Sequence, residues 1–272
     1  VAEQKTAMAA AFAAVAQAAA DGLQGRIILT VLSAGETGRH TAIEAMSGTL
    51  DTPPDLAIIC LGTDSKIGAG NKGRIDIEIS VEGRSVHSST PSAGIDAIDG
   101  ARHCLNALKT LDLGVPENPV FGAATLTPTA IKSGPNATHT LQDRVDMTFD
   151  RRLLPGEDPE SAFAGVRDAL PTDGPWNIQC RLGPLMYPNE IADDGTLMTL
   201  LRGAYADAGL GKAETVTCNF ALDAGYFGHR GIEAIMLGPG EIDQFHSEEE
   251  HVQISDLLDM AQVYRALIAR TF

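Results

Sequence analysis

The sequence predicts an α/β protein: a parallel-rich mixed sheet with helices on its faces, interrupted by an inserted α+β domain. Toward both ends of the chain, helical segments alternate with short apolar segments, which is typical of strands buried in a parallel sheet. From Arg74 to Glu82 apolar and polar residues alternate instead, which indicates an antiparallel strand with one solvated face. We therefore expect residues 1–73 and 188–272 to form one domain and residues 74–187 to form the inserted domain.

The first part of the larger domain begins with an alanine-rich segment that carries Glu3 and Gln17. These polar residues favour an amphipathic helix over the apolar core of a signal peptide. Ile, Leu and Val dominate the two strand segments that follow. The predicted order is a helix over residues 3–21, a strand over 26–33, a glycine turn over 34–38, a helix over 39–49 and a strand over 55–61.

The inserted domain continues from the alternating strand with a helix, two more strands, a helix opened by Pro159 and a last strand. These elements are predicted over residues 94–111, 121–132, 143–151, 159–169 and 176–182. The resulting order β-α-β-β-α-β resembles a ferredoxin-like sandwich.

The last part of the chain returns to the helix and strand pattern of the first. A helix over residues 194–208, strands over 214–218 and 232–237, and a helix over 254–270 complete the larger domain. The last strand stops at the turn 238–240, which reads Gly-Pro-Gly.

Composition excludes several classes of function. The chain has 272 residues and a net charge of -16, with 20 Lys and Arg against 36 Asp and Glu, which repels nucleic acid and anionic membrane surfaces. No segment is long and apolar enough to span a bilayer, and four scattered cysteines indicate free thiols in a reducing, cytoplasmic environment. Residues 68–73 match GxGxxG, but an alternating strand follows them instead of a helix, so a dinucleotide site is not expected.

Three side chains are predicted to meet at the carboxyl edge of the parallel sheet, where open α/β sheets bind ligands. Glu36 follows the strand predicted over 26–33, and His246 follows the strand predicted over 232–237. Glu3 lies at the start of the first helix, where a preceding strand would end. Taken singly, each is a helix cap or a solvated loop charge. Taken together, two carboxylates and an imidazole suit zinc, manganese or a similar divalent cation.

Four segments carry a resemblance to a known family. Residues 81–98 are similar to the signature V-x-G-x-x-x-H-x-S-x-P-x-x-G-x-x-A-I, and residues 150–157, 238–246 and 3–5 match further motifs. The chain resembles, over essentially its whole length, the co-catalytic metallohydrolases of the acetylornithine deacetylase, succinyl-diaminopimelate desuccinylase, aminoacylase and carboxypeptidase G group. The resemblance implies a phosphorylase/hydrolase-like catalytic domain and a dimerisation, or lid, domain that builds a homodimer.

The resemblance also implies roles for single residues. Glu3 stands where the bridging carboxylate stands, while Glu36 and His246 stand where the ligands of one metal stand. His87 matches a histidine that reaches into the partner subunit's site and steadies the oxyanion. Arg152 matches an arginine that binds a substrate carboxylate.

Further positions extend this site. His139 replaces the family's usual Asn in the substrate pocket. The turn with Gly238 and Gly240 is expected to stabilise developing negative charge. His87 and Glu36 are the candidate catalytic residues.

The chain departs from the family at three places. Gly35 occupies the position of the general base. The other metal's glutamate should fall at or near Leu61, where the chain reads Cys60-Leu61-Gly62, with Asp64 as the nearest carboxylate. The family's H-x-D motif should precede Glu3, whereas the sequence begins at Val1, so the chain looks truncated or processed. These departures favour one metal ion over two.

The general base is therefore left open among several side chains. A mononuclear site still activates water, but another group must carry the proton. Four candidates remain: Asp64, His40, Glu241 and Asp243.

The sequence thus supports a metal-dependent hydrolase that cleaves a C–N bond, in an amide or peptide, of a small carboxylate-bearing substrate. Hydrolytic deamination of an unusual or aromatic amino acid is a variant on the same scaffold. The competing hypothesis is a catalytically silent homologue that serves as a dimeric binding protein.

Overall fold

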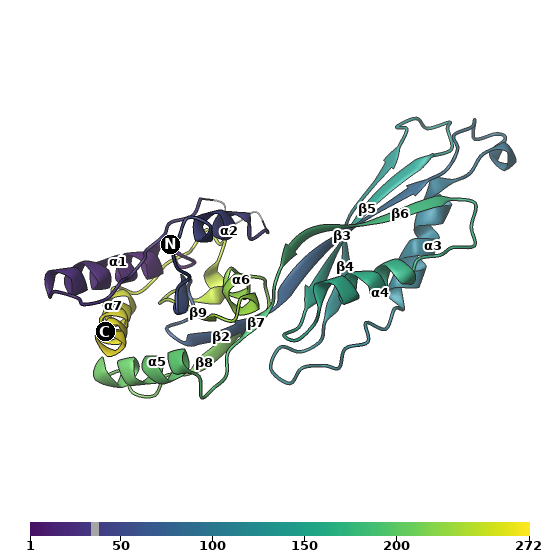
Figure 1. Cartoon of the computed structure of the whole chain (residues 1–272). Coiled ribbons are helices and arrows are strands. Elements are labelled where there is room, and N and C mark those ends of the chain that lie inside the picture. The colour runs from purple at the N-terminus through teal and green to yellow at the C-terminus, as the bar shows by residue number, and fades with distance from the viewer. Residues whose placement is uncertain (34–37) are drawn as a thin grey trace. The chain divides into compact units, whose positions relative to one another are not determined.

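The computed structural model describes residues 1–33 and 38–272 (Figure 1). The chain divides into two compact units, one formed by Val1–Asn71 with Tyr187–Phe272 and the other by Lys72–Met186. We call them the outer unit and the inserted unit. Each has its own sheet and its own hydrophobic core.

The sheet of the outer unit is mixed, as the sequence predicts. Its described strands are β1 (Leu56–Cys60), β2 (Ile67–Asn71), β7 (Asn189–Glu190), β8 (Thr215–Cys218) and β9 (Glu233–Leu237). Strands β1 and β9 pair in parallel, as do β2 and β8, whereas β2 pairs antiparallel with β7 and β9. The order β1-β9-β2-β7 places β9 between β1 and β2, and the paired ends of β1 and β9 place the loops that follow them side by side.

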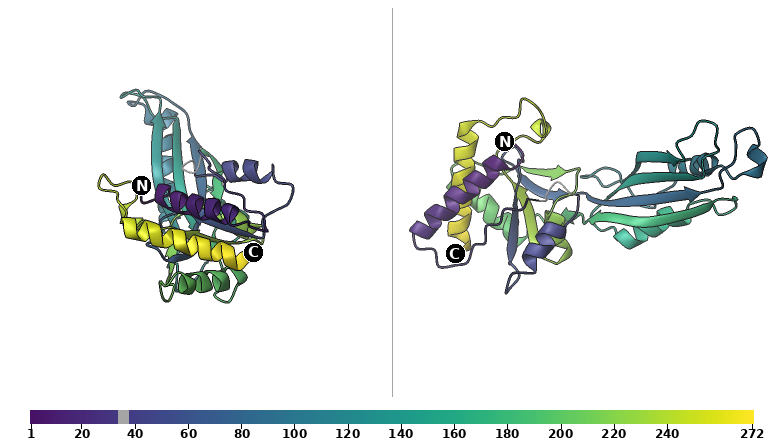
Figure 2. Two further views of the ribbon diagram at one scale, coloured as in Figure 1. Left: turned by 90° about the vertical axis from the view of Figure 1, so that its left-hand side faces the viewer. Right: turned by 90° about the horizontal axis from the view of Figure 1, so that it is seen from above.

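Helices cover both faces of this sheet (Figures 1 and 2). The helices are α1 (Lys5–Ala20), α5 (Thr196–Asp207) and α7 (Ile254–Thr271) on one face, and α2 (Thr41–Ser47) and α6 (Ala224–His229) on the other. The alternation along β9 follows this arrangement, because Ile235 and Leu237 pack with the first set and Ala234 and Met236 with the second.

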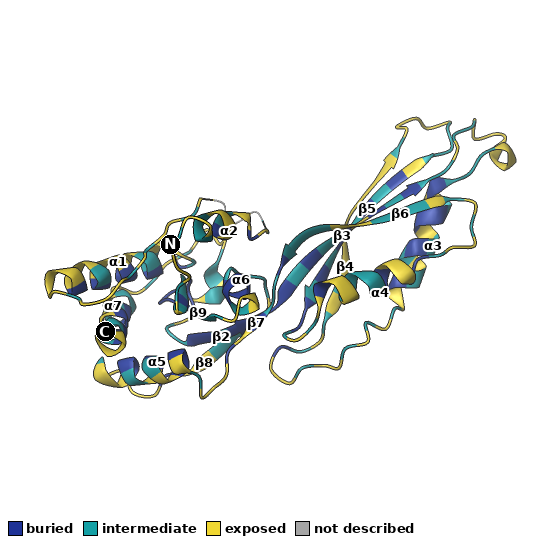
Figure 3. Cartoon of the chain, viewed as in Figure 1, coloured by how far each residue is buried: buried dark blue, intermediate teal, exposed yellow. Residues whose placement is uncertain are grey.

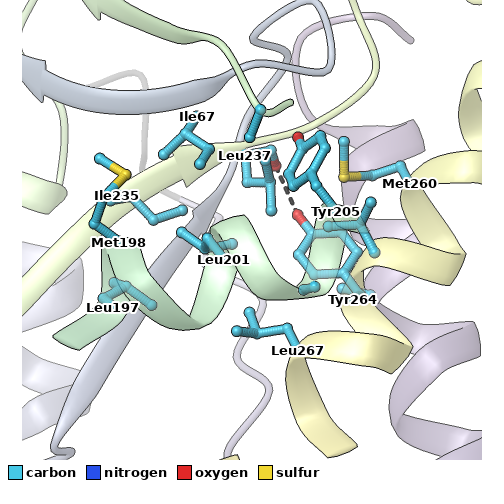
Figure 4. Close-up of a cluster of buried hydrophobic side chains, with 14 of the residues drawn as sticks. Ile67, Leu197, Met198, Leu201, Tyr205, Ile235, Leu237, Met260, Tyr264 and Leu267 are labelled. Atoms are coloured by element: carbon cyan, nitrogen blue, oxygen red, sulfur yellow. Dashed lines mark hydrogen bonds between the residues drawn. The ribbon is translucent and has the colours of Figure 1, made fainter. Parts of the chain in front are cut away.

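The core on the first face is shown in Figure 4. Tyr264 of α7 is buried there and donates its hydroxyl to the carbonyl oxygen of Leu237 at 2.6 Å, so its polar end is satisfied. Leu201 of α5 is completely buried in the same cluster. The buried residues of α1 are all alanines. Their small side chains let α1 approach its neighbours closely.

The inserted unit has the predicted order β-α-β-β-α-β and an antiparallel sheet. Its elements are β3 (Gly73–Glu82), α3 (Ala97–Lys109), β4 (Thr125–Gly134), β5 (Arg144–Leu153), α4 (Pro159–Asp168) and β6 (Asn177–Met186). The strand order is β4-β5-β3-β6 and all neighbours are antiparallel. Both helices begin at an aspartate cap, Asp96 for α3 and Asp158 for α4, whose side chain accepts a backbone N–H of the first turn.

The alternation that predicted β3 sorts its side chains between two faces (Figure 3). Ile75, Ile77, Ile79 and Val81 are buried in the core with residues of α3 and α4. The polar residues between them lie on the opposite face, which these helices leave uncovered. Strand β4 lies at one edge of the sheet, and nearly all of its residues are exposed.

The prediction of a strand over residues 26–33 is wrong. These residues are irregular, no described strand pairs with them, and Ile28 and Val31 are exposed. Leu29 and Leu32 still pack against the cores as side chains. An apolar run becomes a strand only where a neighbouring backbone completes the hydrogen-bond ladder, and here none does.

Strands β2 and β7 and helix α6 were not predicted. Strand β2 reads Ile-Gly-Ala-Gly-Asn and therefore lacks the apolar pattern of a strand. Gly68 has a packing reason, because a Cβ there would lie 2.7 Å from the Cβ of Met236 on β9. Among the described helices, none is long and apolar enough to cross a membrane.

Candidate metal and substrate site

The loops that follow β1 and β9 are joined by backbone hydrogen bonds. The last residues of the two strands, Cys60 and Leu237, are register partners. Beyond them, the N–H of Thr63 donates to the carbonyl oxygen of Gly238 at 3.0 Å, and the N–H of Asp64 donates to that of Gly240 at 2.8 Å. The Gly-Pro-Gly turn is thus fixed against the loop after β1.

The segment before α1 lies between these two loops. The N–H of Gly62 donates to the carbonyl oxygen of Glu3 at 2.6 Å. A Cβ at Gly62 would lie 2.4 Å from the carbonyl oxygen of Ala2, and a Cβ at Gly240 would lie 1.9 Å from the same atom. Only glycine permits this approach, so Gly62 and Gly240 hold the segment that carries Glu3, while the buried Gly238 packs against Leu61 and Ala7.

This packing brings Glu3 and His246 together. The Nε2 atom of His246 lies 3.4 Å from Oε2 of Glu3, although the two residues are at opposite ends of the chain. Two ligand atoms of one tetrahedral zinc ion, each about 2.0–2.1 Å from it, lie about 3.3–3.4 Å apart. The separation therefore fits two ligands of a single cation, and it also fits an ion pair with a protonated imidazole.

Backbone strain is concentrated at the same place. Asp64, Ser65 and His246 have φ angles of 57°, 54° and 59°, and they are the non-glycine residues with positive φ among those that the structure describes. All three lie in the loops after β1 and β9. Such conformations cost about 1–3 kcal/mol each and gather at functional sites.

Glu36, the third predicted ligand, lies outside the described residues. Within residues 1–33 and 38–272, no group of three or more His, Cys, Asp or Glu side chains is arranged to hold a metal. Glu3 and His246 therefore form a partial ligand set, and a complete site requires a further donor.

Glu250 borders this pair and was not predicted. Its Oε1 accepts the N–H of Glu3 at 3.0 Å, and its Oε2 lies 2.7 Å from the nitrogen of Val1. The Val1 ammonium, and then the N–H of Glu3, lower the pKa of this carboxyl. The sequence signal that could have indicated it is the acidic run 248–250 just after His246.

His40 has a structural position. Its Nε2 accepts the backbone N–H of Tyr187 at 2.9 Å, so the proton of the neutral ring is on Nδ1, which contacts Asp223 Oδ1 at 2.9 Å. The ring also stacks on Tyr187, with 5.7 Å between centroids. Since both nitrogens are engaged, His40 is a poor candidate for the proton carrier.

The other candidates for the general base are open to solvent. Asp64 is exposed and pairs with Lys66 Nζ at 2.8 Å, while Glu241 accepts Gln244 Nε2 at 2.9 Å. Asp243 is exposed in the short 3-10 helix Ile242–Gln244. Leu61, in place of the second metal's glutamate, is 1% exposed and contributes to the core.

In the inserted unit, His87 and His139 lie close together on neighbouring loops. Their ring centroids are 6.3 Å apart, and His87 forms a β-bridge with Thr140. The N–H of Ser89 donates to His87 Nδ1 at 3.2 Å, which leaves the proton of the neutral ring on Nε2. Both histidines are exposed, so His87 presents an N–H donor to a ligand.

Arg151 and Arg152 face opposite sides of the inserted sheet. Arg151 is 1% exposed among the core residues and pairs with Glu157, which also accepts the N–H of Leu154. Arg152 lies on the uncovered face, where Asp150 binds it through Nε at 2.8 Å and Nη2 at 3.0 Å. Of the two arginines, only Arg152 is placed to meet a ligand.

Comparison with known proteins agrees with this architecture. The family described as "Peptidase dimerisation domain" matches residues 69–177. Acetylornithine deacetylase of Aliivibrio fischeri strain MJ11 is 28% identical over 211 residues, which cover 74% of this chain and 54% of the relative. The chain spans about half the length of the curated relatives it matches.

Two solved structures share the fold. Aminopeptidase PepT from Bacillus cereus superposes with a TM-score of 0.75 at 18% identity, over 98% of this chain and 70% of that chain. An M20 family metallo-carboxypeptidase from Sulfolobus solfataricus gives a TM-score of 0.73 at 15% identity, over 97% and 75%.

Proposed function

Because the chain belongs to the M20 peptidase family and contains its dimerisation domain, we propose that it is a metal-dependent hydrolase of amide or peptide C–N bonds. The substrate class is a small molecule with a free carboxylate. The relatives point the same way, since they include an acetylornithine deacetylase, an aminopeptidase and a metallo-carboxypeptidase.

The observation that carries the proposal is the 3.4 Å separation between Glu3 Oε2 and His246 Nε2 at the strained carboxyl edge of the outer sheet. These two side chains, with Glu36 as the third donor, would hold zinc or manganese. When bound, such a cation polarises a carbonyl oxygen and lowers the pKa of a bound water to about 7. Glu250 holds the backbone of Glu3 and so keeps this carboxylate near the imidazole.

The inserted unit, a ferredoxin-like domain in this proposal, supplies the remaining groups. His87 donates Nε2–H to the developing oxyanion in the site of the partner subunit, and His139 lies beside it in the substrate pocket. Arg152 binds the substrate carboxylate, a task that its planar guanidinium suits.

A homodimer is therefore part of the proposed enzyme. The exposed edge strand β4 has a row of backbone groups with no neighbouring strand among the residues that the structure describes, and it carries the exposed apolar Ile131. We propose that two copies meet along this edge. Ile131→Asp should shift the mass measured by light scattering from dimer to monomer, and an unchanged dimer would contradict this choice of edge.

The proposed activity is tested by incubating the protein with N-acetyl amino acids and dipeptides and measuring the free amine that hydrolysis releases. His246→Ala and Glu3→Gln should each lose nearly all turnover and at least half of the bound metal. His103→Ala, the same change at a half-buried histidine of α3, is the matched control and should retain both. If His246→Ala kept wild-type turnover, the proposed site would be refuted.

One observation favours a second candidate function, a catalytically silent binding protein of the same fold. The buried Leu61 lies at or near the position where the resemblance implies a ligand of the second metal. Metal analysis separates the two candidates. Less than about half an equivalent of metal, with no rise in thermal stability on adding zinc or manganese, would favour the silent protein.

A further inference from the structure

The uncovered face of the inserted sheet carries a chain of ion pairs where β3 begins and β5 ends. Arg74 and Arg152 are register partners on these strands, and so are Asp76 and Asp150. Residues two apart on a strand share a face, so all four side chains lie opposite the apolar core. This arrangement joins two arginines and two carboxylates on adjacent strands.

The contacts within this chain are short and directional. Asp150 binds Arg152 through Oδ1 to Nε at 2.8 Å and Oδ2 to Nη2 at 3.0 Å. The same Oδ2 lies 3.2 Å from Nε of Arg74. Asp76 in turn accepts two hydrogen bonds from Arg74, both at 2.8 Å. The carboxylates are only 14% and 16% exposed, which strengthens these pairs relative to surface ones.

The geometry leaves one edge of Arg152 open. A guanidinium offers two forked edges to carboxylates, one through Nε and Nη2 and one through Nη1 and Nη2. Asp150 occupies the first edge, and in the part of the chain that the structure describes the guanidinium of Arg152 makes no further hydrogen bond. The second, terminal edge therefore has the donors for one planar carboxylate.

A third cation favours an anion at this place. Lys72 precedes Arg74 by two positions, is 7% exposed and donates Nζ to the carbonyl oxygen of Ala123 at 2.7 Å. Burial, and then the charge of Arg152, lower its pKa, so the two cations are near enough to interact. Three cations thus accompany the two carboxylates, in a chain whose net charge is -16.

We propose that Asp150, held in its turn by Arg74, is a positioning residue that fixes Arg152 so that its terminal edge binds the carboxylate of an N-acyl amino acid. The inference rests on the proposed function for the assignment of Arg152 to substrate binding. Asp150 acts through Arg152 and does not touch the ligand itself.

The test is the affinity of the full chain for N-acetylglycine and for N-acetylglycinamide, which differ only in the carboxylate. Titration calorimetry of the wild type should show at least about tenfold tighter binding of the acid. Asp150→Asn should weaken binding of the acid at least about tenfold. If net charge alone governed binding, removing this negative charge would strengthen it, so the two explanations predict opposite signs.

Asp146→Asn is the matched control, because it removes the same charge from the same face of β5. Its affinity for N-acetylglycine should equal that of the wild type. Arg74→Gln releases Asp150 without touching its pair with Arg152, and it should weaken binding in the same direction by a smaller factor. Thermal unfolding of each variant shows whether it still folds. If Asp150→Asn does not fold, Arg74→Gln still tests the positioning role.

Equal or tighter binding by Asp150→Asn would overturn the inference, and so would a wild type that binds acid and amide alike. These outcomes are distinct from failure of the proposed function. Selective binding of the acid without any turnover would refute the hydrolase and keep the positioning role. Turnover of N-acyl amino acids with the same KM in wild type and Asp150→Asn would support the hydrolase and refute the positioning role.

Discussion

Replacing Gly240 by alanine tests whether the turn after β9 positions the Glu3–His246 pair. The new Cβ would lie 1.9 Å from the carbonyl oxygen of Ala2 and 2.6 Å from its Cα, whereas Cβ contacts below 3.0 Å essentially do not occur. The obstructing atoms are backbone, so no change of rotamer relieves the overlap. Ala2 must move by about 1 Å, and Glu3 moves with it.

The displacement should lower the free energy of unfolding in two ways, and the structure allows the magnitude of each to be estimated. Overpacking typically costs about 1–3 kcal/mol. The hydrogen bonds that hold the segment, Gly62 N–H to Glu3 at 2.6 Å and Asp64 N–H to Gly240 at 2.8 Å, would lengthen, at about 1 kcal/mol each. We expect the free energy of unfolding to fall by about 2–4 kcal/mol. A shift of about 1 Å also takes Glu3 Oε2 out of the spacing that two ligands of one zinc ion require.

Urea unfolding and zinc titration measure both effects on one preparation. Gly165→Ala is the matched control, because Gly165 lies in helix α4 and a Cβ there would meet no atom within 4 Å beyond its chain neighbours and its own helix backbone. Alanine there should leave zinc binding unchanged and stabilise the protein by up to about 1 kcal/mol. The packing argument would be refuted if the free energy of unfolding of Gly240→Ala lay within about 0.5 kcal/mol of the wild-type value and the variant bound zinc equally well.

Three further outcomes are expected. Leu201→Ala, which empties a completely buried position, should lower the free energy of unfolding by about 2–5 kcal/mol in urea, and a loss below about 1 kcal/mol would contradict the packing described. Arg144 lowers the pKa of Asp146, so this pair stabilises the fold above the unfolded carboxyl pKa of about 4 and stops doing so as pH falls through the lower folded value. Asp146→Asn should therefore flatten the acid limb of a stability–pH curve, and an unchanged limb would count against the pair. Mixing inactive His87→Ala and His246→Ala chains should restore about a quarter of wild-type turnover if His87 acts across the dimer, and none if it acts within its own subunit.

Sequence patterns predicted most of the fold because local physics decides those elements. The alternation in β3, the proline that opens α4 and the Gly-Pro-Gly turn after β9 each act within a few residues. The pattern misled where pairing decides, since the apolar residues 26–33 find no neighbouring strand. The glycine-rich β2 shows the converse, because it is a strand only through its neighbours β8 and β9.

The candidate site divides along the same line. The sequence indicated Glu3 and His246 as residues of one sheet edge, but their 3.4 Å separation arises from the packing of glycines against Ala2. The roles of Glu250 and of the pair Arg74–Asp150 could not be predicted from the sequence, because each acquires its role only from a partner distant in the chain.

The sequence by itself determined the class of the fold, the residues that form the apolar face of each helix and strand, and the residue types available for metal and carboxylate binding. It did so because hydrophobic periodicity and turn chemistry depend on near neighbours along the chain. Only the tertiary structure decided which charges meet and which arginine of the pair 151–152 faces outward with an open edge. It also decided that His40 is buried with both ring nitrogens engaged. Distances and desolvation between remote side chains set those outcomes, and neither quantity is written in local sequence.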